Sequence, residues 1–172
     1  PAGRCGWSLA RALQQSRPDL IPVIWAANPA SFYIWAAQEY QLPGFLDKTL
    51  PVIELLWWFD VATRVGSAWP GHLLARARVW EQQAAVRLQA LPEEHWRLWF
   101  GLVRGESNAE LAVHLGWSRR TVERRLGGLY SALGVQHRVE AVAVAWQWGL
   151  VKVGAGGPEW GPVVRDLFPI PS

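Results

Sequence analysis

Residues 107–126 read SNAELAVHLGWSRRTVERRL, which is two short helical patterns on either side of Gly116-Trp117. Ser107 followed three residues later by Glu110 is a capping box, in which the hydroxyl accepts from a backbone N–H and the carboxylate reaches back. Gly116 favours a turn, and Ser118 is well suited to cap a following helix. The pattern therefore predicts a helix that ends at Leu115, a tight turn, and a second helix that begins at Arg119.

The two predicted helices carry complementary apolar faces. Leu111, Ala112 and Leu115 recur at helical spacing on the first helix and can pack against three apolar residues of the second, Val122, Leu126 and Leu129. The small Ala112 would let the two helices cross closely. This arrangement is a helix-turn-helix.

An arginine cluster marks the start of the second helix. Four arginines lie within seven residues and are opposed only by Glu123: Arg119, Arg120, Arg124 and Arg125. Such a cluster repels itself unless an anionic partner or solvent relieves it. A helix N-terminus with guanidinium groups suits a phosphate backbone, and Arg can contact guanine edges in the major groove. We expect these side chains to face outward onto DNA; the simpler alternative is a helical interaction domain with a solvated arginine face.

The surrounding sequence predicts a mainly α protein with four regions. Residues 91–152 contain two more helical patterns, at 93–103 and 137–148, which complete a four-helix domain. Residues 67–90 read as a connecting helix. Residues 1–66 alternate short helices with two short strands, which indicates a partial α/β region. Residues 153–172 are rich in Gly and Pro, and we expect a flexible tail there.

Composition excludes several classes of function. A lone Cys5, expected to be a small buried or frayed residue, rules out a disulfide framework, and the four histidines lack metal-ligand spacing. No phosphate loop or nucleophile elbow is present, so we expect neither an enzyme nor a cofactor. The apolar stretches are too short to cross a bilayer and no signal sequence opens the chain, which predicts a soluble cytoplasmic protein without a membrane partner. The net charge of +3 is too mild to indicate nucleic acid by itself.

Residues 91–150 resemble the LuxR-type (GerE) DNA-binding domain of the NarL/FixJ response regulators. The residues that carry the resemblance are Gly105, Ser107-Asn108-Ala109-Glu110-Leu111-Ala112, Leu115-Gly116, Ser118, Thr121-Val122, Leu133-Gly134-Val135 and Arg138-Val139-Glu140-Ala141. The resemblance implies that the helix from Arg119 to Ala132 is the recognition helix, with Thr121 near a phosphate and Val122 near the groove. One departure is Glu123, where the family usually has Lys.

The resemblance also assigns partners and contact residues. Family members bind paired half-sites as dimers and recruit or block RNA polymerase, which implies a homodimer on double-stranded DNA. Together with the arginine cluster, it predicts DNA contacts at Asn108, Ser118, Arg119, Arg120, Thr121, Val122, Arg124 and Arg125. Dimer contacts are expected on the fourth helix, at Val139, Val142, Ala143 and Trp146.

Residues 1–66 resemble the last part of a CheY-like receiver. Gly6-Trp7-Ser8-Leu9-Ala10, Val23-Ile24-Trp25 and Gly44-Phe45 follow in receiver order, and Lys48 matches the lysine that pairs with the aspartyl phosphate. The matched part lacks the phosphoacceptor Asp and the acidic pair for magnesium, which phosphoryl transfer needs. We therefore expect a regulator that is not phosphorylated in this form, either as a fragment or through degeneracy. The alternative is an interaction module that pairs with an intact response regulator without binding DNA.

Overall fold

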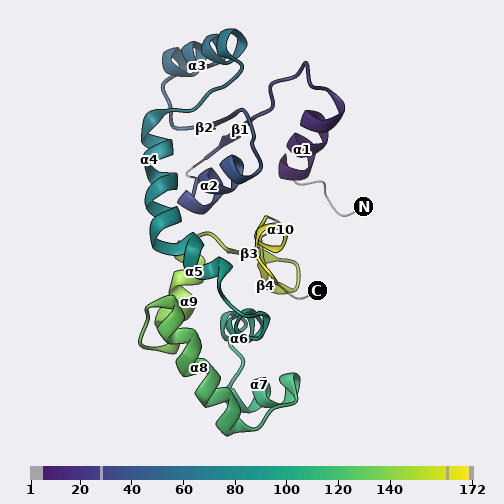
Figure 1. The fold of residues 1–172 in the computed structure, drawn as a ribbon, viewed down its shortest axis with the longest axis vertical. Coiled ribbons are helices and arrows are strands. Elements are labelled where there is room, and N and C mark those ends of the chain that lie inside the picture. Colours follow the sequence, from purple (N-terminus) through teal and green to yellow (C-terminus); the bar gives the residue numbers. More distant parts are fainter. Residues whose placement is uncertain (1–5, 28, 162, 171–172) are drawn as a thin grey trace. The chain divides into compact units, whose positions relative to one another are not determined.

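The computed structural model describes residues 6–27, 29–161 and 163–170, and its chain divides into two compact units (Figure 1). Unit 1 is Pro1–Glu81 and unit 2 is Gln82–Ser172. Cys5 lies outside the described residues, so its predicted burial stays a prediction. The division falls inside the predicted connecting segment 67–90. That segment is helical, as α4 (Gly71–Trp80), a π-helical stretch η1 (Glu81–Ala85) and α5 (Val86–Gln89).

Unit 1 is an incomplete α/β arrangement, as the alternating pattern predicts. Its remaining elements are α1 (Gly6–Ser16), β1 (Val23–Ala26), α2 (Ser31–Glu39), β2 (Gly44–Asp47) and α3 (Val52–Val65). The two strands pair in parallel, with Val23 opposite Gly44. A Cβ added at Gly44 would lie 2.6 Å from the backbone oxygen of Ala68, so only glycine fits this close crossing.

The core of unit 1 is rich in aromatic rings. Phe32 and Trp35 of α2 are buried, and their ring centroids lie 5.4 Å and 4.9 Å from that of Trp80 in α4. By contrast, α3 leaves several large apolar side chains exposed: Val52, Ile53, Leu56, Trp57, Phe59 and Val65. Burial in unit 1 is therefore uneven.

Unit 2 contains the four predicted helices of 91–152. They are α6 (Glu93–Val103), α7 (Asn108–Leu115), α8 (Arg119–Leu133) and α9 (Arg138–Gln147). Trp96, Leu98 and Trp99 of α6 are fully buried, and the Trp99 indole Nε1 donates to the Ala141 carbonyl of α9 at 2.8 Å. The mainly α fold class is thereby confirmed.

Residues after Lys152 do not form the expected flexible tail. They make an antiparallel hairpin, β3 (Val151–Gly154) and β4 (Gly157–Trp160), followed by the short helix α10 (Val164–Leu167). The ring centroid of Trp160 lies 5.4 Å from that of Trp96 and 5.6 Å from that of Trp99. The Gly and Pro content suggested mobility, but the apolar residues Trp160, Val163, Val164 and Phe168 are buried, and the rings of Trp160 and Phe168 pack on Trp96 of α6.

Among the described residues, no helix combines the length and the apolar character that a membrane span requires. The longest is α8, and arginines occupy its first turns.

Candidate nucleic-acid interface

The first helix of the predicted pair, α7, begins as the capping box predicts. The Ser107 hydroxyl accepts from the Glu110 N–H at 3.3 Å, and the Glu110 carboxylate accepts from the Ser107 N–H at 2.7 Å. The same backbone donor holds the pKa of the Glu110 carboxyl below its usual value. Two of the N–H groups that a helix leaves unpaired are thus satisfied.

The turn between α7 and α8 is tight and closed by backbone hydrogen bonds. Gly116 has φ +66° and ψ +32°, the left-handed conformation that glycine adopts without strain. The Trp117 N–H donates to the Ala112 carbonyl at 2.9 Å. Ser118 then caps α8, since its hydroxyl accepts from the Thr121 N–H at 3.1 Å and lies 2.9 Å from the Thr121 hydroxyl. The corner that results is visible in Figure 1.

The predicted packing between the two helices is confirmed. Leu111 and Ala112 of α7 are buried, as are Val122, Leu126 and Leu129 of α8, while Leu115 is half-buried. This packing fixes which side of α8 faces away from the protein.

Three of the four clustered arginines lie on that outer side. Arg119, Arg120 and Arg124 are exposed, and so is Glu123. An open hollow of about 490 Å³ at the start of α8 is lined by Ser118, Arg120, Thr121, Glu123 and Arg124. The guanidinium groups and the N-terminal end of the helix dipole together make this surface electropositive.

The fourth arginine does not face outward as expected. Arg125 is half-buried, forms an ion pair with Glu94 of α6, and places its guanidinium carbon 5.5 Å from the Trp117 ring centroid. At 100° per residue, position 125 falls about 40° from the buried Leu129 and about 60° from the buried Val122 on the helix circumference, at the edge of the packing face. Closeness in sequence grouped it with the outer arginines, whereas helical angle places it with the packing face.

The location that the resemblance implies for Val122, near the groove of DNA, also differs from the structure. Its side chain is fully buried between α8 and its neighbours, so it cannot lie in a groove of DNA in this conformation. Its apolar spacing with Leu126 and Leu129 had already predicted a packing role, and the structure agrees with that spacing.

Asn108 is held by a residue that the site prediction omitted. Arg138 of α9 donates to the side-chain oxygen Oδ1 of Asn108 at 3.4 Å and also to the Glu106 backbone carbonyl. Arg138 stood within the quoted family residues, but nothing in its local sequence reveals a partner thirty positions away. It ties the start of α7 to α9.

The predicted dimer residues share one side of α9. Val139 and Trp146 are exposed by 77% and 39%, Ala143 is exposed, and Val142 is half-buried. The opposite side is turned inward by the buried Ala141 and Ala145. The predicted apolar face is therefore accessible, and its use in a dimer stays a prediction.

Lys48 of unit 1 is exposed at the end of β2. Its ammonium lies 5.1 Å from the Trp25 ring centroid, a cation–π distance. This contact gives the Lys48 ammonium a partner within unit 1.

Known proteins resemble this chain in sequence over a short stretch and in fold over most of its length. No protein-family profile matches the chain. A stretch of 52 residues is 38% identical to the transcriptional regulatory protein YdfI of Bacillus subtilis, covering 30% of this chain and 24% of YdfI. The RcsB response regulator of Salmonella typhimurium superposes with a TM-score of 0.58, at 15% identity over 81% of this chain and 66% of RcsB.

The two-component response regulator RcsB, in a structure of its complex with DNA, superposes with a TM-score of 0.50. The identity is 14%, over 83% of this chain and 67% of that RcsB chain. The chain therefore resembles the response regulator RcsB in fold over the part that superposes. The chain spans 66% of the Salmonella RcsB chain, and its match to YdfI spans 24% of that protein, less than two thirds in each case.

Proposed function

We propose that this protein is a DNA-binding transcription regulator of the LuxR/NarL response-regulator type, with α8 in the major groove. The observation that supports this most is the exposure of Arg119, Arg120 and Arg124 at the serine-capped start of α8. Phosphate contacts fix register, and base-edge contacts give sequence preference. The YdfI similarity and the RcsB–DNA neighbour support the same function.

The proposed contact set is narrower than the sequence prediction. Ser118, Arg119, Arg120, Thr121 and Arg124 face the DNA, and Asn108 lies near the backbone. Val122 and Arg125 hold the recognition helix against the rest of the domain, because both side chains face the protein.

The wider assignment follows the same resemblance. The regulator binds as a homodimer through the α9 face, acts in the cytoplasm on RNA polymerase, and works without phosphorylation of unit 1. These features remain proposals alongside DNA binding.

A salt series tests DNA binding directly. The full chain is titrated with a mixed-sequence duplex at several salt concentrations by fluorescence anisotropy. Each neutralised phosphate contributes about 0.9 to the slope of log K against log salt, so a slope between about −3 and −6 is expected. Arg119→Ala, Arg120→Ala and Arg124→Ala each reduce that slope by about 1.

Arg64→Ala is the matched control, because Arg64 is an exposed arginine of α3 that pairs with Asp60. It should leave both affinity and slope unchanged. A slope near zero for the parent protein, or equal slopes for all four variants, contradicts the proposal.

A second candidate is the interaction module that pairs with an intact response regulator. The exposed apolar face of α3 favours it, since scattered single apolar residues are common on surfaces but six on one helix are not. Co-purification with an intact regulator, in a sample that shows no duplex binding at low salt, would favour this candidate over the first.

A further inference from the structure

The outer side of α8 continues past its arginine cluster. Arg120, Arg124, Gly127 and Ser131 recur at spacings of four, three and four residues, so they form one line along the helix, and all four are exposed. Glu123, the one acidic residue of α8, borders this line, since it follows Arg120 by three residues and precedes Gly127 by four. With Arg120 and Arg124 it also lines the open hollow at the start of the helix.

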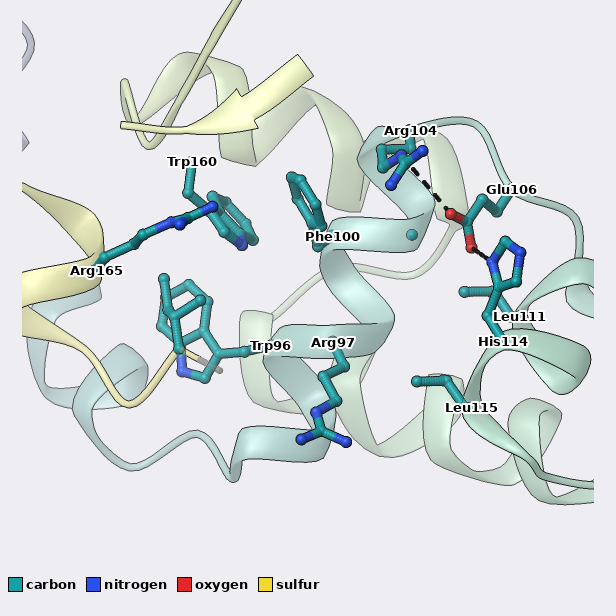
Figure 2. A pocket seen from close by; sticks show the side chains of 12 residues that line it. Trp96, Arg97, Phe100, Arg104, Glu106, Leu111, His114, Leu115, Trp160 and Arg165 are labelled. Carbon is teal, nitrogen blue, oxygen red and sulfur yellow. Dashed lines mark hydrogen bonds and ion pairs between the residues drawn. The ribbon is translucent and has the colours of Figure 1, made fainter. Parts of the chain in front are cut away.

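The carboxylate of Glu123 is unpaired, unlike the other acid groups of unit 2. Glu106 lies 3.8 Å from Arg104 and 3.0 Å from His114, the two contacts that Figure 2 marks with dashed lines. The other acidic side chains in the described part of unit 2 each have a partner too: Glu93, Glu94, Glu110, Glu140, Glu159 and Asp166. Among the described residues, none lies at hydrogen-bond or ion-pair distance from the Glu123 carboxylate, although two arginines lie one helical turn before it. Both of its oxygens are therefore free to accept hydrogen bonds from another molecule.

An acid group at this position weakens the attraction of α8 for phosphate. Arginines attract the backbone of every duplex alike, whereas a carboxylate beside them repels it. Only a hydrogen-bond donor in the duplex offsets that repulsion, and the donors in the major groove are the exocyclic amines of cytosine and adenine. Adenine places its N7 acceptor next to the amine, which repels a carboxylate, while cytosine presents N4 without an acceptor on the same base. Glu123 therefore suits cytosine.

Gly127 leaves α8 bare one turn after Glu123. A Cβ added at Gly127 would meet nothing within 4 Å beyond its own helix backbone, whereas one added at Gly128 would lie 3.4 Å from the Nε2 atom of His95. Packing within the chain thus gives a reason for a small residue at position 128 but none at position 127. Glycine inside a helix is less stable than alanine, and a common reason for its presence is the close approach of a ligand to the backbone.

We propose that Glu123 recognises a cytosine in the major groove, where its carboxylate accepts a hydrogen bond from the N4 amine, and that Gly127 gives the duplex room to approach α8. This inference rests on the proposed DNA binding and adds the base that the helix selects. Arg120 and Arg124 lie beside the carboxylate and suit guanine O6 and N7, so the preferred site combines cytosine with guanine. Thymine in place of the cytosine is rejected, because its O4 is an acceptor that faces another acceptor.

Selection from a random duplex library tests the recognition of cytosine with the full chain. Duplexes are selected with the parent protein, and affinities are then measured by fluorescence anisotropy for the selected duplex and for versions in which each cytosine in turn becomes thymine. We expect one such change to weaken binding by the parent about tenfold. Glu123→Gln should reduce that ratio to less than about threefold, because an amide can accept from cytosine N4 or donate to thymine O4.

Glu54→Gln is the matched control, because Glu54 is an exposed acid of α3 and its substitution removes the same charge. It should keep the parent's ratio. An equal ratio in Glu123→Gln, or a parent that binds every duplex alike, would overturn the inference and leave DNA binding in place. A parent that binds no duplex even at low salt would remove both.

A second variant tests the close approach at Gly127. Gly127→Ala should raise the temperature of thermal unfolding, because alanine is the better helix former, and yet weaken binding to the selected duplex by about fivefold or more. Gly71→Ala is its control, since Gly71 of α4 is also exposed with open space around it, and it should leave the affinity unchanged. Far-UV circular dichroism checks that all variants keep their helices. An unchanged affinity in Gly127→Ala would show that the duplex does not approach α8 there.

Discussion

Helix α6 of unit 2 and helix α3 of unit 1 differ in how far their large apolar side chains are buried. In unit 2 the rings of Trp96, Trp99 and Trp160 are all buried against one another, whereas α3 of unit 1 leaves Trp57 more than half exposed. The contrast shows that tryptophan content does not decide burial; the presence of a covering element does. In unit 2 the C-terminal hairpin covers α6, and no described element covers the outer side of α3.

The N-termini of the helices in the helix pair also differ from those of α3 and α4. The helices α7 and α8 begin at serines whose hydroxyls accept a backbone N–H, while α3 and α4 follow Pro51 and Pro70 without a side-chain cap. Local sequence therefore defines the starts of α7 and α8 more sharply than those of α3 and α4, whereas α6 and α9 of unit 2 also begin without a side-chain cap.

The largest expected effect tests the hairpin as the cover of unit 2. Trp160→Ala should lower the free energy of unfolding by about 3–5 kcal/mol, because it removes a buried ring and leaves a cavity beside Trp96. Urea unfolding followed by far-UV circular dichroism measures it. Trp57→Ala, at 57% exposure, should cost less than about 1 kcal/mol. Similar losses for the two variants would remove the contrast between the units.

A smaller effect tests the serine caps. Ser107→Ala should lower the free energy of unfolding by about 1 kcal/mol, because the Glu110 N–H loses its acceptor. Ser131→Ala is the control, since Ser131 is exposed inside α8, where Ala is the better helix former. The same urea titration applies, and a Ser107 variant as stable as the parent would mean that the cap is dispensable.

A pH series tests the seam between α6 and α8. Burial lowers the pKa of the His95 imidazole below its ordinary value of 6.5, and a Cβ added at Gly128 would lie 3.4 Å from its Nε2. The unfolded chain therefore takes up a proton near pH 6.5 that the folded chain accepts only at lower pH. Stability should fall as the pH drops from about 7 through that range and rise as the pH increases.

His95→Gln should flatten this part of the profile, as measured by thermal unfolding between pH 5 and 8. His72→Gln is the control, because His72 is exposed on α4 of unit 1. An unchanged slope in His95→Gln would assign the pH dependence to another group.

The smallest effect is expected on α3. Ile53→Thr should change the free energy of unfolding by no more than about 0.5 kcal/mol, since Ile53 is 76% exposed. Urea unfolding at two protein concentrations measures it. A loss well above 1 kcal/mol, or one that grows with concentration, would show that another molecule covers α3.

Local signals made the helix pair of unit 2 predictable. The capping box at Ser107, the glycine turn and the apolar spacing of Leu111, Leu126 and Leu129 are all set by neighbours within a few residues. The prediction failed where distant contacts decide the outcome. Arg125 turns inward because Glu94 lies on α6, and Asn108 is bound by Arg138 of α9.

The hairpin was missed for a related reason. Gly and Pro between 154 and 162 indicate turns, but two turns so close together also permit a short strand pair. Trp160 packs on the aromatic rings of α6, which are distant from it in the sequence. No pattern near Trp160 predicts that contact.

Trp160 and Phe168 cover the buried rings of α6, and this has a practical consequence for preparing shorter fragments of the chain. A fragment cut at Lys152, where the resemblance to known DNA-binding domains ends, would bare the indoles of Trp96 and Trp99 to water. Such a fragment should aggregate rather than remain soluble as an independent domain. Grafts and reporter fusions of this domain therefore need to carry the chain through at least Ile170.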